Sequence, residues 1–140
     1  MHLPDVNVWL ALAFASHMHH PSATAWFAGI AGGDCAFCRV TQQGFLRLAT
    51  TPNVMTVGTV GLAQAWQMYD DLFADPRIVF AEEPEGIELL WRKHTQLQSF
   101  SPKVWNDAYL AAFAEAANFE VVTFDHGFTR YRSVRCTVLP

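Results

Sequence analysis

The sequence predicts an α/β domain of three layers, in which helices cover both faces of a mostly parallel sheet. Short apolar segments alternate along the chain with longer segments whose apolar residues recur every three or four positions. This alternation is typical of parallel sheets, because each return to a parallel strand needs a crossover, which is usually a helix. The chain has 140 residues, 51% hydrophobic and 16% charged, so it can bury one substantial core. We expect residues 1–140 to form a single domain.

The N-terminal half is expected to contain two strands and four helices. Pro4 keeps the first strand short, because proline lacks the amide hydrogen that a sheet ladder needs. Pro21 is typical of the first turn of a helix, and Thr41 is a candidate N-cap. The segment Thr51-Pro52-Asn53 is expected to end the helix that Thr41 begins. In chain order, the expected elements are strand 2–5, helix 9–14, helix 21–30, strand 36–37, helix 41–49 and helix 59–73.

The C-terminal half is expected to contain three strands and two helices. Ile78, Val79 and Phe80 form a short run of residues that favour strands. The pair Ser101-Pro102 is typical of a helix start. In chain order, the expected elements are strand 77–81, helix 84–97, helix 101–117, strand 120–124 and strand 136–139.

Charge and cysteine content narrow the class of protein. The net charge of −4 and the pI near 5.8 argue against a protein that coats nucleic acid, although an acidic nuclease site neutralised by metal ions remains compatible. Three cysteines are an odd number and favour a reducing compartment. The residues before the first apolar run contain no Lys or Arg, which argues against a signal peptide, and no apolar run is long enough to span a membrane. We therefore expect a cytoplasmic protein with no membrane partner.

Three aspartates are the candidate site. Asp5 and Asp125 follow expected strands, and ligands of open α/β sheets gather at the carboxyl ends of the strands. From Asp107 to the helix end is about 10 residues, or ~15 Å, and the following strand returns ~16 Å, so Asp107 and Asp125 are expected at the same level. Carboxylates that converge need a cation, and oxygen ligands select Mg²⁺ or Mn²⁺. The alternative for each aspartate alone is an N-cap or turn residue.

The same residues lie in motifs that resemble a known family. The segments 3–12 (LPDVNVWLAL), 106–114 (NDAYLAAFA) and 122–128 (VTFDHGF) resemble PIN-domain toxins of the VapC type. Segments around 17–27 and 40–48 match a subgroup of that family, so the resemblance extends over essentially the whole chain in order.

The resemblance implies a PIN-like fold with a parallel sheet of four or five strands flanked by helices. It further implies a Mg²⁺-dependent endoribonuclease toxin, which hydrolyses RNA, forms a homodimer and is neutralised by a VapB-type antitoxin. Asp5, Asp107 and Asp125 match the metal-binding acids of the family. Asn7 and Thr123 match polar positions with a supporting role.

One departure from the family pattern concerns a further acid. Related proteins carry an acid, usually Glu, on the helix that here contains Gln42, Gln43 and Gly44, where no acid is present. Either glutamine has a carbonyl oxygen to offer, but a neutral ligand holds Mg²⁺ less tightly than a carboxylate. If Gly44 faces the site, Gly44→Glu is expected to strengthen metal binding. The missing acid also motivates an alternative function, a catalytically weak or inactive module that binds RNA or a partner.

Two further groups of residues have both a functional and a structural interpretation. Lys103, Arg130 and Arg132 lie close to the candidate acids in sequence and are candidates for RNA-backbone contacts, or else belong to a solvated surface.

A C-x₂-C pair, Cys35 and Cys38, with upstream histidines suggests a zinc site. The pair lacks a second ligand pair at suitable spacing, which favours packed apolar cysteines. The histidines concerned are His17, His19 and His20.

Overall fold

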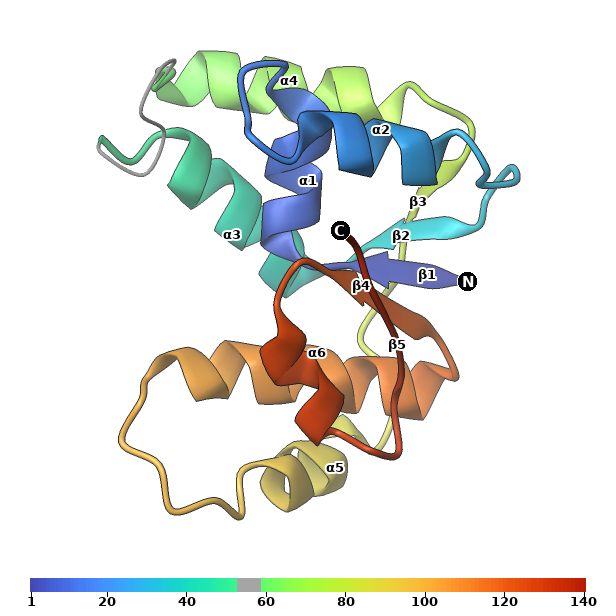
Figure 1. Cartoon of the computed structure of the whole chain (residues 1–140), viewed down its shortest axis with the longest axis vertical. Coiled ribbons are helices and arrows are strands. Elements are labelled where there is room, and N and C mark those ends of the chain that lie inside the picture. Colours follow the sequence, from blue (N-terminus) through green and yellow to red (C-terminus); the bar gives the residue numbers. More distant parts are fainter. Residues whose placement is uncertain (53–58) are drawn as a thin grey trace.

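A five-stranded parallel sheet forms the middle layer of the computed structural model, which describes residues 1–52 and 59–140 (Figure 1). The strand order is β3-β2-β1-β4-β5, and every neighbouring pair is parallel. The strands are β1 (His2–Pro4), β2 (Cys35–Phe37), β3 (Ile78–Phe80), β4 (Glu120–Thr123) and β5 (Arg135–Val138). The predicted three-layer α/β fold is therefore confirmed, with the larger of the two expected strand numbers.

Helices cover both faces of the sheet. Helices α1 to α4 lie on one face, and α5, α6 and the short 3₁₀ helix η1 lie on the other (Figure 1). Their bounds are α1 (Val6–Ala13), α2 (His20–Phe27), α3 (Arg39–Ala49), α4 (Leu62–Phe73), α5 (Ile87–His94), α6 (Lys103–Ala117) and η1 (His126–Arg130).

Each face of the sheet has its own apolar core. On the α1–α4 side, the fully buried ring of Trp9 stacks on Phe37 with centroids 3.7 Å apart and an interplanar angle of 12°. On the other side, the small residues of α6 let this helix lie close to the sheet, and Phe113 is 1% exposed. Burial of these large aromatic side chains favours folding.

The central strands place the candidate site. β1 pairs with β4, with Pro4 opposite Val122, so the residues that follow these strands emerge side by side. The amide of Asp5 extends this ladder with a hydrogen bond to the carbonyl of Val122 at 2.9 Å. Because the strands are parallel, their carboxyl ends form one edge of the sheet.

Several expected boundaries differ from the structure. α3 begins at Arg39 with Cys38 as its N-cap, and Thr41 lies at the third helical position, where its hydroxyl accepts from the Cys38 amide at 3.0 Å. The expected helix 84–97 is limited to α5, and Gly86, in a left-handed backbone conformation (φ 78°), accounts for its later start. α3 ends at Ala49 as expected, while Asn53, part of the segment expected to end it, lies outside the described residues.

Among the residues that the structure describes, no helix is long and apolar enough to cross a membrane.

Candidate metal-binding cleft

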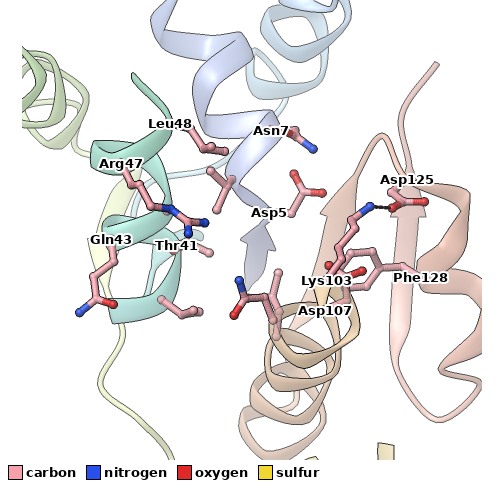
Figure 2. Close-up of a pocket in the computed structure, with 15 residues that line it drawn as sticks. Asp5, Asn7, Thr41, Gln43, Arg47, Leu48, Lys103, Asp107, Asp125 and Phe128 are labelled. Carbon is pink, nitrogen blue, oxygen red and sulfur yellow. Dashed lines mark hydrogen bonds and ion pairs between the residues drawn. The ribbon is translucent and has the colours of Figure 1, made fainter. Parts of the chain in front are cut away.

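A cleft of about 340 Å³ opens at the carboxyl edge of the sheet. Its walls come from the start of α1, from α3, from the first turns of α6 and from the segment after β4 (Figure 2). Asp5, Asp107 and Asp125 all line it, although they are distant in sequence. The structure therefore brings the three predicted aspartates to one cleft.

Asp5 is the N-cap of α1 and is only 7% exposed. Its Oδ1 accepts a hydrogen bond from the amide of Val8 at 3.0 Å, and its Oδ2 accepts one from the hydroxyl of Thr123. Burial raises the pKa of Asp5 above its ordinary value, and these two hydrogen bonds oppose the rise. The N-cap interpretation and the site interpretation of Asp5 are thus compatible, since capping leaves the carboxylate at the cleft.

Asp107 projects from the second turn of α6. Among the described residues its half-buried side chain lines the cleft without a hydrogen-bond or ion-pair partner. Burial raises the pKa of Asp107, while the nearby Lys103 ammonium acts in the opposite direction. A partly desolvated carboxylate without a direct partner is poised to gain from a bound cation.

Asp125 follows β4 and caps η1. Its Oδ1 accepts from the amide of Gly127 at 2.7 Å, and its Oδ2 forms an ion pair with Nζ of Lys103. These contacts, Lys103 foremost, hold the pKa of Asp125 below its ordinary value. A side chain at position 127 would crowd this arrangement, because a Cβ there would lie 2.9 Å from Oδ1 of Asp125.

Thr123 connects two of the acids. It is fully buried, and its hydroxyl donates to Asp5 while accepting from the amide of Asp125 at 2.9 Å. Asn7 lines the cleft from the first turn of α1, with its amide directed into it (Figure 2). Both residues therefore lie where a supporting polar role was expected.

The three carboxylates share the cleft without closing around one point. Among the described residues, no three His, Cys, Asp or Glu side chains are arranged closely enough to hold a metal ion as they stand. The cation that does contact an acid here is the Lys103 ammonium, on Asp125 (Figure 2). In donor chemistry the residues fit a hard divalent cation, since all three offer carboxylate oxygen and Asp5 and Asp107 have unbalanced buried charge.

The α3 wall carries no acid. Gln43 and Arg47 line the cleft from this helix, whereas Gln42 is buried and accepts a hydrogen bond from Arg39. Of the two glutamines considered as ligands, only Gln43 therefore reaches the cleft.

Gly44 lines the cleft with its backbone only. A Cβ at Gly44 would lie 2.5 Å from Cγ2 of Val6. The side chain of Val6, in the first turn of α1, therefore occupies the space next to Gly44 on α3. Gly44→Glu would therefore bring its Cβ against Val6, and its expected strengthening of metal binding stays a prediction.

Arg47 was missed by the sequence analysis. Its guanidinium extends into the cleft opposite the acids (Figure 2). The available signal was its spacing of four residues from Gln43, which places both side chains on one helix face.

Of the three candidate RNA-contacting cations, Lys103 alone lines the cleft. Arg130 is exposed and donates from Nε to the carbonyl of Gly127 at 2.7 Å, and Arg132 is exposed as well. Both arginines therefore belong to the solvated surface.

The cysteines and histidines do not assemble into a zinc site within the described part of the chain. Cys35 and Cys38 are buried, and burial raises the pKa of the Cys35 thiol to about 12, which opposes the thiolate that zinc needs. His19 stacks on Phe124 at 4.3 Å, and His20 Nδ1 lies 2.7 Å from the carbonyl of Ala11. These side chains have packing and hydrogen-bonding roles.

Comparisons with known proteins show which family this chain resembles. The family model for the PIN domain matches residues 3–134. Ribonuclease VapC41 of Mycobacterium tuberculosis is 46% identical over 144 residues, with 99% of each chain covered. Ribonuclease VapC44 of the same organism is 32% identical over 143 residues, covering 99% of this chain and 91% of the relative.

Solved structures show the same fold at low sequence identity. VapBC2 from Rickettsia felis, bound to a DNA fragment from its promoter, superposes with a TM-score of 0.74 and 14% identity, covering 99% of this chain and 98% of the other. Mycobacterium tuberculosis VapC20, a sarcin-ricin loop cleaving toxin, has a TM-score of 0.72 and 15% identity over all of both chains.

A parallel α/β sheet with three carboxylates in a cleft at its carboxyl edge defines a nuclease-like domain of the PIN class. The chain belongs to the PIN-domain family, within its VapC ribonuclease group.

Proposed function

We propose that this protein is a Mg²⁺-dependent endoribonuclease toxin of a type II toxin–antitoxin module. The observation that carries the proposal is the meeting of Asp5, Asp107 and Asp125 in one cleft. It is supported by full-length relatives that are named ribonucleases. Residues 1–140 act as one domain in this proposal.

The three aspartates are the proposed metal ligands and catalytic residues. They would hold Mg²⁺, for which Mn²⁺ can substitute, and the ion would supply an activated water and offset negative charge on the phosphodiester. Asp5 and Asp107 gain most from the cation, because burial leaves their charge poorly solvated. Thr123 holds Asp5 in place, since its hydroxyl is itself fixed by the amide of Asp125.

The opposite wall is suited to the RNA backbone. Arg47 extends into the cleft from α3, and a guanidinium binds phosphate through two parallel hydrogen bonds. Asn7 and Gln43 offer amide groups along the same opening. With the acids on one side and Arg47 on the other, an RNA phosphate is held between the metal ligands and a fixed positive charge.

A VapB-type antitoxin is the proposed partner. Solved relatives of this fold include VapBC complexes. We also propose that the toxin is a homodimer and that it acts in the cytoplasm, where RNA is available and the three cysteines remain reduced.

A second candidate function rests on the α3 wall. No acid lies on that wall, and Lys103 forms an ion pair with Asp125. The alternative is therefore a weakly active or inactive module that binds RNA or a partner. This alternative has the same cleft but no turnover.

Calorimetric Mn²⁺ binding and RNA cleavage test the two candidates together. The two proteins compared are wild type and Asp107→Asn, both purified without antitoxin. A nuclease binds Mn²⁺ and cleaves RNA, and Asp107→Asn loses both. A binding module retains RNA binding in both proteins, and neither protein cleaves. Equal cleavage by wild type and Asp107→Asn contradicts the proposed ligand set.

A further inference from the structure

Lys103 occupies an unusual place for a lysine. It is the first residue of α6, where the partial positive charge of the helix N-terminus disfavours a cation. The residue before it, Pro102, has no polar side chain that could cap the helix. A compensating interaction is therefore expected, and it lies in the cleft.

That interaction is with the acids. Nζ of Lys103 pairs with Oδ2 of Asp125, across 22 residues of sequence. The hydrogen bond to Asp125, and attraction to Asp107, Asp125 and Asp5, raise the pKa of Lys103 further above its ordinary value. All three acids therefore favour the charged ammonium form of Lys103.

The Lys103 side chain is also able to move away from Asp125. It is 61% exposed, so its movement requires no repacking of the core. A lysine ammonium sits on a flexible four-carbon stem and makes no bidentate contact that would fix it. Asp125 meanwhile keeps its second oxygen on the amide of Gly127, so its position does not depend on the lysine alone.

We propose that Lys103 is a tethered counter-cation of the cleft, which balances the carboxylates while no metal is bound and competes with the metal for Asp125. The inference rests on the proposed metal site. Its consequence is a metal affinity set below that of the carboxylates alone, because the incoming cation must displace the ammonium. Lys103 is a positioning residue in this account, since it acts through Asp125.

The test is Mn²⁺ calorimetry on the metal-stripped full-length chain, with the thermal unfolding midpoint of the same samples. Lys103→Met removes the charge and keeps the length of the stem. It is expected to tighten Mn²⁺ binding about three- to tenfold and to enlarge the Mn²⁺-induced rise in Tm. The metal-free variant is expected to unfold at a lower temperature than the metal-free wild type.

Arg47→Met is the matched control. It removes a positive charge from the opposite wall of the same cleft, where the structure shows no ion pair to an acid among the described residues. Its Mn²⁺ affinity is expected to change less than about twofold. An equal gain in both variants would mean a general charge effect and would overturn the inference.

The outcomes separate this inference from the proposed function. If Asp107→Asn abolishes Mn²⁺ binding while Lys103→Met leaves it unchanged, the metal site stands and the counter-cation role is refuted. If wild type binds no Mn²⁺, or Asp107→Asn binds it as well as wild type does, the ligand set is wrong and the inference falls with it.

Discussion

The hydroxyl of Thr123 donates a hydrogen bond to Oδ2 of Asp5, joining residues 118 positions apart in the chain. The contact exists because β1 and β4 are neighbours, so the last residue of β4 reaches the residue that follows β1. The same hydroxyl accepts from the amide of Asp125, and one buried group thereby sets the relative position of two proposed ligands.

Replacement of this hydroxyl is expected to impair both stability and metal binding. Thr123→Val keeps the shape but removes the hydrogen bond that lowers the pKa of Asp5 and leaves the Asp125 amide without its acceptor. We expect a loss of about 1–3 kcal/mol in the free energy of unfolding, measured with urea, and weaker Mn²⁺ binding. Thr123→Ser retains the hydroxyl and is expected to restore Mn²⁺ binding. Wild-type affinity in Thr123→Val would contradict the positioning role.

Asp107→Asn is expected to abolish RNA cleavage while leaving the metal-free protein folded and slightly more stable at pH 7. Because the folded-state pKa of Asp107 is raised, the unfolded chain loses this proton at lower pH than the folded chain. Tighter binding of this proton stabilises the folded chain. The stabilisation is complete below pH 3.8, the ordinary pKa, and is lost as pH rises through the folded-state pKa of Asp107.

Asparagine avoids this loss at neutral pH, since it carries no charge to desolvate. We expect a gain on the order of 0.5–1 kcal/mol in urea unfolding without metal. A destabilised Asp107→Asn variant would show that its carboxylate has a structural partner.

Gly44→Ala tests the close approach of α1 and α3. The added Cβ meets Val6 at 2.5 Å, and a β-branched side chain has few ways to move aside. We expect the free energy of unfolding, measured with urea, to fall by about 1–2 kcal/mol, because the overpacking penalty outweighs the better helix propensity of alanine.

In a Val6→Ala background the same substitution is expected to be neutral or to stabilise by up to about 1 kcal/mol. A double-mutant cycle measures the difference. An equal effect in both backgrounds would mean that the contact with Val6 does not determine the need for glycine at position 44.

Metal binding is expected to release protons in mildly acidic solution. The raised pKa values of Asp5 and Asp107 leave these carboxyls more protonated at pH 5 than ordinary aspartates, and the metal needs them ionised. Mn²⁺ affinity should therefore fall from pH 7.5 to pH 5. Calorimetry in buffers of different ionisation enthalpy counts the protons released when Mn²⁺ binds. Asp107→Asn is unsuitable as a control, because it removes a proposed ligand. A pH-independent affinity would contradict the titration of these two acids.

Much of the fold could be predicted from the sequence, because its signals are local. Apolar run length and helical spacing are properties of neighbouring residues, and they identified the elements and the parallel sheet. The same local pattern placed Asp5 and Asp125 after strands, while helix and strand lengths placed Asp107 level with Asp125. The Cys38 N-cap was missed, since a cysteine is not among the preferred capping residues.

The contacts within the cleft required the tertiary structure. Gln42 and Gln43 are adjacent and chemically identical, yet Gln42 is buried and accepts a hydrogen bond from Arg39, whereas Gln43 faces the cleft. The rotation of the helix relative to the sheet decides which of the two side chains is buried. The sequence alone determined which acids are available and at which end of the strands they emerge. Only the tertiary structure decided that Val6 closes off Gly44 and that Lys103 reaches Asp125, because such contacts depend on how distant elements pack against each other.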